Sequence, residues 1–377
     1  MRAKLYRRLF FILLVPMIFM LSGCDDFEKT FSFNSNSGQI AESVIEAADG
    51  SYVIAGLTYE TFTKNPVLLK MNPEGEKLLE IVYPYKGTFN SIKAANGGGY
   101  VIAGATGEYQ DYAGSILKTD ESGNQVWAFS YGYTLYDVEV LDDGYLVVGG
   151  SSFNGKLYIA KLTLSGEVVW ELTDETNGEG TDVAVLSDGN FMVVTKTASI
   201  VEFDPNGVIV WSQSHAVGNI SARTFRSIAA TSDGGFILGG QLEEGQDYDV
   251  WVIRLNADRE IVWEKTYTGT KVVSVGIDGL NSIVQTTDGG FVFCGFQAQI
   301  GANIFNGGSL YGWVMKIDQN GTEEWSKTRG ADNKKNEALK SIIQTSDGRL
   351  LSVGSTRSFA QEEDLEWWVL RFDEGSN

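Results

Sequence analysis

Side chains that commonly act as nucleophiles, general bases or zinc ligands are scarce in this chain of 377 residues, which has one His and two Cys. His215 follows Ser214, and a Ser–His pair could serve a hydrolase if a carboxylate oriented the imidazole. Adjacency in sequence does not assemble such a triad, and the chain has no G-x-S-x-G motif. We therefore predict that His215 is a solvated loop residue and that Cys294 is a small buried side chain. No catalytic residue is predicted.

Acidic side chains gather in two segments that could hold a calcium ion. One contains Glu243, Glu244, Asp247 and Asp249, and the other is residues 362–364. The ligand order of an EF-hand loop is absent from both. We expect two solvated acidic loops and predict no metal ligand and no cofactor, with a structural calcium ion left as an open alternative.

The first 24 residues have the organisation of an export signal. Basic residues at positions 2, 4, 7 and 8 precede an apolar stretch, Leu9 to Gly23, of 15 residues. That stretch is shorter than the ~20 residues of a membrane-spanning helix, and its order of regions is typical of a cleaved signal peptide. The alternative is an uncleaved signal anchor that ends in a buried Cys.

The segment Leu21-Ser22-Gly23-Cys24 resembles the lipobox of bacterial lipoproteins. The resemblance implies that residues 1–23 are removed, that Cys24 takes a diacylglycerol, and that its new amine is acylated, for example by palmitate. Residues 24–26 would then be a short tether. Two or three acyl chains anchor a protein stably to a bilayer. We expect a membrane-anchored lipoprotein, periplasmic or surface-exposed, with the leaflet left open.

A turn signal recurs seven times between strand-like runs, at spacings of 45 to 59 residues. An Asp-Gly pair flanked by alternating apolar residues predicts a two-residue hairpin turn with both central residues at positive φ. The seven pairs are Asp49-Gly50, Gly97-Gly98, Asp143-Gly144, Asp188-Gly189, Asp233-Gly234, Asp288-Gly289 and Asp347-Gly348.

Each repeat contains four strand-like runs, and the fifth repeat shows them at 227–231, 236–240, 251–255 and 261–267. Four short strands at this period indicate a β-propeller blade. We therefore predict an all-β fold, a seven-bladed β-propeller of four-stranded blades over residues 27–377. It should be a single domain, because a ring of blades cannot be divided without exposing blade faces.

The seventh repeat shows no fourth strand before Asn377, and the missing strand is found near the other end. Residues 27–31 (FEKTF) match residues 263–267 (WEKTY) almost residue for residue. We predict that this N-terminal strand completes the last blade and closes the ring. Closure would hide two edge strands that otherwise invite aggregation.

The repeats resemble those of WD-repeat and PQQ-type propellers. They are more similar to the repeats of bacterial lipoprotein propellers, which contain the motifs Asp-Gly-Gly-Phe and Trp-Val-x-Lys-Leu-Asp-x-x-Gly. Residues 233–236 are one copy of the first motif. The resemblance covers the mature chain and implies a fold without a defined activity. A PQQ dehydrogenase would use a carboxylate-lined calcium site and often an adjacent Cys pair, so PQQ is not expected here.

Eight of the nine tryptophans occupy equivalent positions of the repeats, and we expect them to pack between blades rather than on a ligand. The ninth, Trp367, lies at the end of a loop. The shared positions are the fourth strand for Trp127, Trp170, Trp211, Trp263 and Trp325, and the third strand for Trp251, Trp313 and Trp368.

Segment length distinguishes the two faces of the ring. In a four-stranded meander, the 1–2 and 3–4 turns lie on one face, and the 2–3 loops and 4–1 connections on the other. The uniform tight turns belong to the first, the Asp-Gly face. The long, varied segments belong to the second, the long-segment face, and such variety is typical of binding loops. These segments are 57–66, 105–114, 214–226, 241–249, 268–281, 296–312, 329–340 and 355–367.

The long-segment face should carry exposed aromatic rings among polar residues, which suits protein or glycan contact. A basic patch of Arg329, Lys334, Lys335 and Lys340 is expected between blades six and seven. The candidate binding residues are Tyr59, Phe62, Tyr109, Tyr112, Phe296, Phe305, Tyr311, Phe359 and Trp367.

The formal charge of −20 argues against nucleic-acid binding, because a phosphate backbone needs a basic surface. The leading hypothesis is a non-enzymatic scaffold that binds an envelope protein through the long-segment face. A glycan-binding surface lipoprotein is the alternative, and an enzyme with its site at the channel mouth is third.

Overall fold

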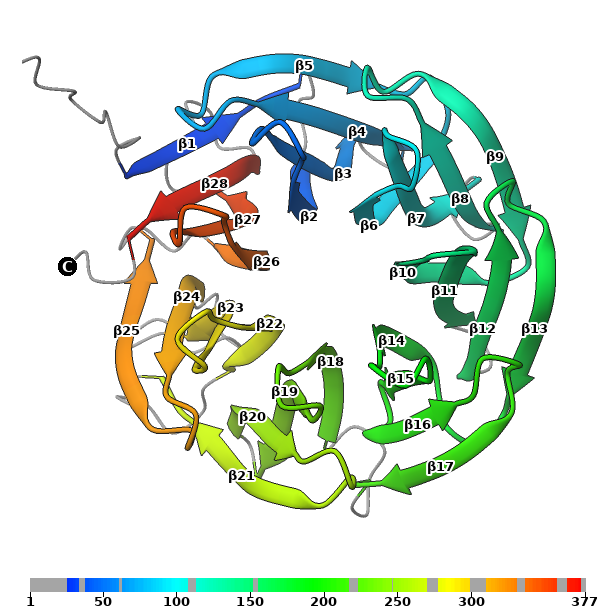
Figure 1. Ribbon diagram of the computed structural model, residues 1–377. Coiled ribbons are helices and arrows are strands. Elements are labelled where there is room, and N and C mark those ends of the chain that lie inside the picture. The colour runs from blue at the N-terminus through cyan, green and yellow to red at the C-terminus, as the bar shows by residue number, and fades with distance from the viewer. Residues whose placement is uncertain are drawn as a thin grey trace, which may run out of the picture.

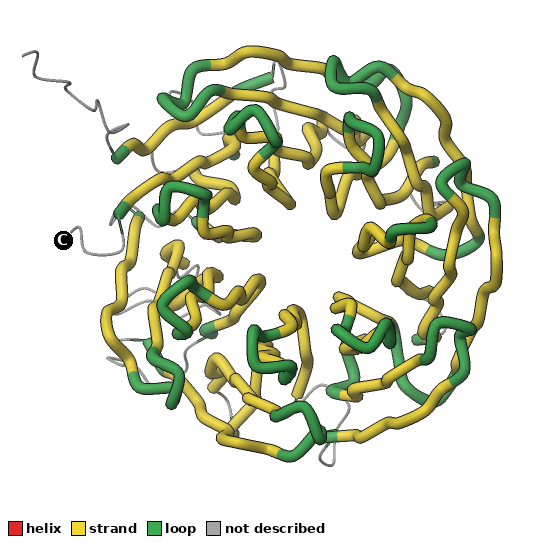
Figure 2. The backbone as a smooth tube through the Cα atoms, viewed as in Figure 1, coloured by secondary structure: helices red, strands yellow, loops and turns green. Residues whose placement is uncertain are grey.

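A computed structural model describes residues 26–33, 38–60, 63–107, 113–151, 155–216, 223–245, 247–269, 277–298, 310–330, 336–357 and 365–373. Over these residues the chain forms strands, turns and loops without helix (Figure 2). Accordingly, this part of the chain has no helix of the length and apolar character needed to cross a membrane.

The strands form seven sheets of four, in chain order around the ring. Blade one is β2 (Gln39–Glu46), β3 (Tyr52–Glu60), β4 (Thr63–Met71) and β5 (Lys77–Val82), and blade two is β6 (Gly87–Ala94), β7 (Tyr100–Thr106), β8 (Ala113–Thr119) and β9 (Gln125–Tyr131). Blade three is β10 (Thr134–Leu141), β11 (Gly144–Ser151), β12 (Lys156–Thr163) and β13 (Val168–Asp174), and blade four is β14 (Gly180–Val185), β15 (Phe191–Thr195), β16 (Ser199–Phe203) and β17 (Ile209–Ser214). Blade five is β18 (Arg223–Ala230), β19 (Phe236–Glu244), β20 (Asp247–Leu255) and β21 (Ile261–Tyr267), and blade six is β22 (Gly279–Gln285), β23 (Phe291–Ala298), β24 (Leu310–Ile317) and β25 (Glu323–Arg329). Blade seven is β26 (Ala338–Gln344), β27 (Leu350–Thr356), β28 (Glu366–Phe372) and β1 (Phe27–Phe31).

The blades are arranged in a ring around a central axis, which confirms the predicted seven-bladed β-propeller (Figure 1). The first strand of each blade lies innermost, and the fourth lies on the outer rim. Second and third strands are buried along most of their length, whereas fourth strands alternate between exposed and half-buried residues. This pattern follows from position, because inner strands have a neighbouring blade on both faces and rim strands meet solvent.

The N-terminal strand closes the ring as predicted. β1 pairs antiparallel with β28, with Phe27 opposite Arg371 and Phe31 opposite Trp367. The Lys29 ammonium donates to the carbonyl oxygens of Glu74 and Gly75, at 3.0 and 2.8 Å, in the neighbouring blade one. Strand β1 therefore provides both the missing fourth strand and contacts to the next blade.

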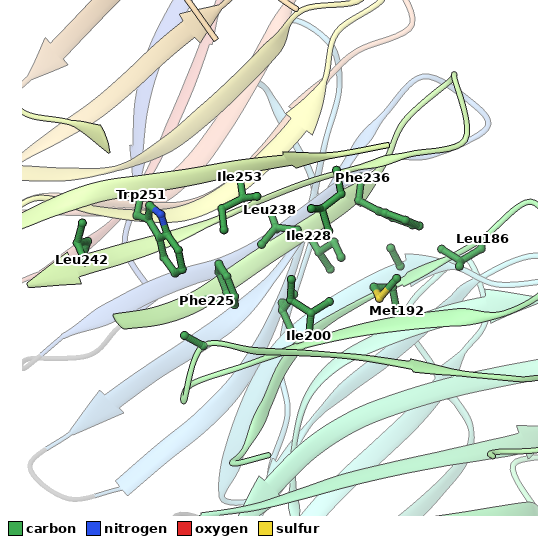
Figure 3. Close-up of a cluster of buried hydrophobic side chains, with 14 residues drawn as sticks. Leu186, Met192, Ile200, Phe225, Ile228, Phe236, Leu238, Leu242, Trp251 and Ile253 are labelled. Atoms are coloured by element: carbon green, nitrogen blue, oxygen red, sulfur yellow. The ribbon is translucent and has the colours of Figure 1, made fainter. Parts of the chain in front are cut away.

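The hydrophobic core is a set of clusters between adjacent blades, of which Figure 3 shows the one between blades four and five. Met192 and Ile200 of blade four pack against the layer of blade five that contains Leu238. Trp251 stacks on Phe225 with ring centroids 4.6 Å apart. The eight repeated tryptophans lie on the third and fourth strands as expected, those of the third strand fully buried or nearly so.

Six of the seven turns between first and second strands differ in detail from the two-residue type that the sequence predicted, whereas in blade three Leu141 lies opposite Gly144 across a two-residue turn. In blade one, the Gly50 amide donates to the Ala47 carbonyl, and the Ala47 amide donates to the Ser51 carbonyl. Gly50 has a φ of 77°, whereas Asp49 is not at positive φ. The turn is therefore a three-residue loop with a left-handed glycine at its end, and the Asp side chain is free to bond elsewhere.

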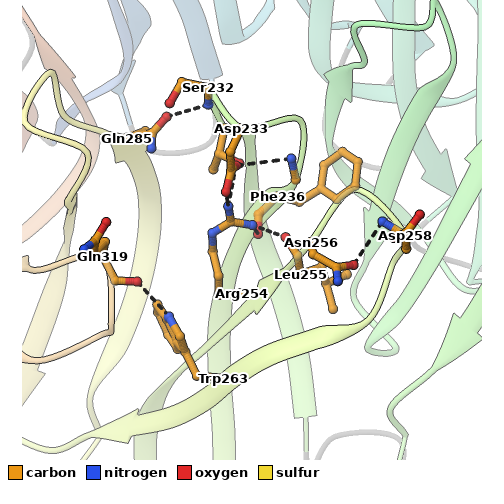
Figure 4. Close-up of polar contacts among 12 residues, drawn as sticks. Ser232, Asp233, Phe236, Arg254, Leu255, Asn256, Asp258, Trp263, Gln285 and Gln319 are labelled. Carbon is orange, nitrogen blue, oxygen red and sulfur yellow. Dashed lines mark hydrogen bonds and ion pairs between the residues drawn. The ribbon is translucent and has the colours of Figure 1, made fainter.

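That Asp side chain pairs with a cation on the third strand of its own blade. Lys70 reaches Asp49 at 2.9 Å and Lys161 reaches Asp143 at 2.8 Å. The same pairs in blades five to seven are Arg254–Asp233, Lys316–Asp288 and Arg371–Asp347. Figure 4 shows the blade-five copy, where Arg254 also donates to the Phe236 carbonyl at 3.0 Å.

Blade four reverses this charge pattern. Glu202 is completely buried at the cation position, and Arg259 from the next blade pairs with it. Arg259 has a φ of 67° and occupies the 3–4 turn position that Gly207 and Gly321 hold in other blades. A non-glycine residue in this left-handed conformation is strained, so the ion pair stabilises a turn that its own backbone disfavours.

Two expected loops of the long-segment face are strand hairpins instead. Strands β3 and β4 pair out to Glu60 opposite Thr63, which covers most of 57–66. Strands β19 and β20 likewise pair out to Glu244 opposite Asp247. Their polar residues continue the ladder, because an antiparallel hairpin beyond the core needs no apolar face.

Candidate functional site: the central channel and the long-segment face

The innermost strands enclose a channel that contains a cavity of about 670 Å³. Every innermost strand has a β-bulge at the same place, for example between Ala41 and Ser43 in β2 and between Phe225 and Ser227 in β18. A bulge leaves one residue outside the ladder and redirects its side chain. The seven bulge residues, which lie outside the strand pairing, line the channel. We name them the bulge ring: Glu42, Asn90, Tyr136, Thr181, Arg226, Asn281 and Lys340.

The residue after each bulge forms a second ring, which we name the belt: Ser43, Ser91, Asp137, Asp182, Ser227, Ser282 and Ser341. In blades one to six, its side-chain oxygen atoms connect a blade to the next one. Ser227 Oγ accepts from the Ile283 amide at 3.2 Å, and Asp182 accepts from the Ile228 amide at 2.8 Å. The belt therefore provides hydrogen-bond acceptors for backbone amides of the innermost strand of the neighbouring blade, which is an edge strand of its sheet.

Two adjacent blades carry Asp where the belt otherwise has Ser. Asp137 is almost fully buried, accepts from Ser91 Oγ at 2.6 Å and from the Val183 amide at 3.3 Å. Burial, together with the negative charge and hydrogen bond of Asp137, holds the pKa of Asp182 well above its ordinary value. Asp137 therefore opposes the ionisation of Asp182 across the boundary between blades three and four.

An ion pair lies beside this acid pair on the Asp-Gly side of the belt. Lys93 Nζ is 2.5 Å from Glu139 Oε1. Burial opposes the charge of Lys93, but the carboxylates of Glu139 and Asp137 outweigh it and raise the pKa of the ammonium above its ordinary value. Burial raises the pKa of Glu139. Blades three and four thus contribute three of the four carboxylates that line the channel, and each of the three has a partner.

The long-segment face is built on buried polar anchors. Asp278 is 5% exposed, and its carboxylate accepts from the Gly269 amide at 2.7 Å and from the Ala298 amide at 2.9 Å. Its backbone carbonyl accepts from Gln241 Nε2 at 2.9 Å. One carboxylate therefore fixes the ends of two segments against blade six, and its carbonyl links them to blade five.

A second anchor lies between blades six and seven. Glu337 is completely buried, and its amide donates to the Leu310 carbonyl at 3.1 Å. The Leu310 amide in turn donates to Asn336 Oδ1 at 3.2 Å. The ends of segments 296–312 and 329–340 are therefore held together.

Three of the candidate aromatic residues are half-buried and cover glycines. A Cβ atom on Gly38 would lie 2.3 Å from the Tyr59 ring, and one on Gly330 would lie 2.2 Å from the Tyr311 ring. Phe296 covers Gly279 in the same way. These rings therefore pack over the 4–1 connections.

The remaining candidates fall into two groups. Trp367 is completely buried, donates from Nε1 to the Leu57 carbonyl at 3.0 Å and packs edge-on against Phe33. The expectation that its ring is exposed is wrong, because the residue begins the buried part of β28 rather than ending a loop. Outside the described residues lie Phe62, Tyr109, Tyr112, Phe305 and Phe359, together with Cys24 of the expected lipid anchor.

The expected basic patch is not one surface. Arg329 ends the rim strand β25, whereas Lys340 belongs to the bulge ring of the channel. Lys334 and Lys335 lie outside the described residues. Sequence proximity is misleading here, because Arg329 lies on a rim strand and Lys340 on an innermost strand.

His215 is half-buried rather than solvated, since its ring lies 6.0 Å from Phe225 and 5.8 Å from Trp251. Burial lowers the pKa of its imidazole. Asp249 is also buried, within β20, so it does not belong to a solvated loop. Cys294 is completely buried, as predicted. Among the described residues, no group of three or more His, Cys, Asp and Glu side chains is arranged to hold a metal ion.

Of the charged residues of the channel, only Lys340 was named from the sequence, and it was assigned to a basic patch rather than to the channel. The charged residues lie inside the first strand of each repeat, where the pattern predicts a plain alternation of buried and exposed residues. A detectable signal was present, because Ser or Asp stands at one equivalent position in all seven copies. The preceding position varies between Glu, Asn, Tyr, Thr, Arg and Lys.

No family model matches the chain, and no curated protein matches it at a significant level. Solved structures do match, and they place it in the class of seven-bladed β-propellers. A streptogramin B lyase is similar over 92% of this chain and 97% of its own, with a TM-score of 0.58 and 15% identity. The WD40 propeller domain of Doa1 is similar over 92% of this chain and 96% of its own, with a TM-score of 0.59 and 15% identity. A catalytically inactive variant of virginiamycin B lyase from Staphylococcus aureus, solved with quinupristin, is similar over 92% of this chain and 99% of its own. Its TM-score is 0.56 and its sequence identity is 12%. At these identities the likeness shows the fold alone.

Proposed function

We propose that this protein is a non-enzymatic binding propeller of the bacterial cell envelope. Acylation of Cys24 would anchor it to a membrane, and the long-segment face would hold a protein partner. The observation that carries the proposal is the anchoring of that face. Asp278 and Glu337, both buried, fix the ends of segments 268–281, 296–312 and 329–340. Varied segments on rigid bases are the usual construction of a binding surface.

The state of the acidic groups in the channel favours binding over catalysis. Asp137, Asp182 and Glu139 are engaged by serine, backbone amide or lysine partners that connect neighbouring blades. A general acid or base needs a position from which it reaches substrate. In virginiamycin B lyase, one of the similar structures, a histidine-to-alanine variant is catalytically inactive. The single histidine of this chain packs on Trp251 and is not part of the channel lining.

Photocrosslinking in living cells tests the binding face. A benzophenone amino acid at Lys86 or Glu244, both exposed on the long-segment face, should capture a discrete partner. Matched positions on the Asp-Gly face are Ser232 and Asn320, also exposed, which should give no such product. Equal products from both faces, or none from either, would contradict the proposal.

Membrane anchoring has its own readout. The Cys24→Ser variant should move from the membrane fraction to the soluble fraction and lose incorporation of labelled palmitate. A variant that stays in the membrane would favour the uncleaved signal anchor.

A further inference from the structure

The bulge ring has a property that the rest of the propeller lacks. Turns, belt residues and tryptophans recur from blade to blade because each repeat has the same packing to satisfy. A bulge residue is outside the ladder and has no such constraint. Its seven copies have six different residue types, two of them cationic and one anionic. The fold therefore does not require one common residue type at this position of the blades.

Four members of the ring are engaged with the protein itself. Asn90 Nδ2 donates to the Leu135 carbonyl and Asn281 Nδ2 to the Leu339 carbonyl, both at 2.7 Å. Thr181 Oγ1 donates to the Phe225 carbonyl at 3.1 Å. The fourth, Tyr136, is bonded through its hydroxyl to Glu179 and Lys196 at the channel mouth. Each of these contacts connects neighbouring blades, so these side chains have a structural reason to be present.

The remaining three members of the bulge ring are charged: Glu42 on blade one, Arg226 on blade five and Lys340 on blade seven. Lys340 Nζ is 3.9 Å from Glu42 Oε2, which is the outer limit of an ion pair. Arg226 makes no side-chain hydrogen bond or ion pair with the part of the chain that the structure describes, although the charge of Glu42 acts on it. The guanidinium is exposed, yet it is exposed to the channel rather than to the outer surface. Such a guanidinium is a ready partner for an anion.

The surroundings of Arg226 strengthen this preference. The channel walls reduce its hydration, and this burial lowers the pKa of the guanidinium despite the opposing effect of Glu42. A partly desolvated cation gains more from an anion than a fully hydrated one does. A planar guanidinium pairs best with a carboxylate, through two parallel hydrogen bonds.

The remaining groups near Arg226 and Lys340 suit hydroxyls. Ser227 and Ser282 accept backbone amides through Oγ, so their own hydrogens are available to a ligand. The carboxylate of Asp137, on blade three across the channel, disfavours a second negative charge on the ligand. The cavity of about 670 Å³ admits a molecule the size of a sugar.

We propose that the central channel binds a small hydroxylated carboxylic acid of the sugar-acid class, with its carboxylate on Arg226 and Lys340 and its hydroxyls toward the serines of the belt. This site is separate from the partner surface proposed above. Glu42 is an internal competitor for the same two cations, so the bound carboxylate displaces the weak Lys340–Glu42 contact.

Calorimetric titration of the purified protein at low ionic strength tests the proposal, with D-glucuronate as the probe. D-glucose is the matched neutral sugar, and inorganic phosphate is an anion without the ring. We expect glucuronate to bind at roughly millimolar affinity or tighter and glucose to bind at least ten-fold more weakly. Arg226→Gln should weaken glucuronate binding at least ten-fold, and Glu42→Gln should strengthen it several-fold.

Lys86→Gln is the matched control, because it removes an exposed cation from the same face outside the channel and should leave binding unchanged. The thermal midpoint of each variant verifies folding. The proposal is overturned if the wild type binds no glucuronate or binds glucose equally well. It is also overturned if phosphate binds as tightly as glucuronate, or if Arg226→Gln binds like the wild type.

Discussion

The reversed ion pair of blade four gives a sharp test of how this ring is stabilised. Replacing Arg259 by Gly would restore the residue type found at the same left-handed turn position of other blades, such as Gly207 and Gly321. On backbone grounds alone, that change should stabilise the protein by about 1 kcal/mol. It would also leave the carboxylate of Glu202, which is completely buried, without its cation.

The loss of the ion pair should destabilise the protein more than the relief of backbone strain stabilises it. Arg259 Nε lies 2.7 Å from Glu202 Oε2. Among the residues that the structure describes, only Asn190 Nδ2, at 2.7 Å from Oε1, would still donate to that carboxylate. Removing one partner of a buried ion pair costs about 3–5 kcal/mol. The net loss is therefore about 2–4 kcal/mol, which corresponds to a fall of about 3–6 °C in the thermal midpoint for a domain of this size.

A double variant provides the matched control. Glu202→Lys combined with Arg259→Gly recreates the pattern of the other blades, with Asp188 in the place that Asp143 and Asp233 hold as partners of Lys161 and Arg254. We expect the double variant to recover most of the stability that Arg259→Gly loses, whereas Glu202→Lys alone should be destabilised by the adjacent guanidinium. Differential scanning calorimetry of the wild type, the two single variants and the double variant measures each of these differences in stability. The reasoning is refuted if Arg259→Gly is as stable as the wild type, or if the double variant is no better than either single one.

Three further results are expected. Because burial and Asp137 raise the folded-state pKa of Asp182, the stabilisation from its protonated form is fully present below the unfolded-state pKa and is lost as the pH rises through the folded value. Asp182→Asn should therefore melt above the wild type at about pH 8 and close to it at about pH 3, and a difference that does not vary with pH would contradict this. Deleting residues 27–33 removes the closing strand and the buried Phe33, and should lower the thermal midpoint by at least about 8 °C; an unchanged melting curve would count against ring closure. Burial raises the pKa of the Cys294 thiol to about 12, so the native protein should not react with Ellman's reagent at about pH 8 but should do so once unfolded in guanidinium. Rapid reaction of the native protein would show that the thiol is accessible.

The repeated part of this architecture could be read from the sequence because each blade restates it. The Asp-Gly pairs, the tryptophans of the third and fourth strands, and the match between residues 27–31 and 263–267 are enough to predict seven blades and their closure. Local geometry explains this success, since a glycine in the left-handed region and an alternating strand are properties of a few neighbouring residues. Even the wrong turn type left the pairing of the strands correct.

Only the tertiary structure decided what lies in the channel and which aromatic rings are exposed. Arg226 and Lys340 are 114 positions apart in sequence, on different blades, and the ring brings both to one channel. Trp367 looked exposed because it ends a polar segment, yet it packs against Phe33 across the closing seam. Burial depends on which blade faces which, and that is a property of the closed ring. The sequence therefore determined the repeated blade, whereas closure of the ring determined the environment of each side chain that departs from the repeat.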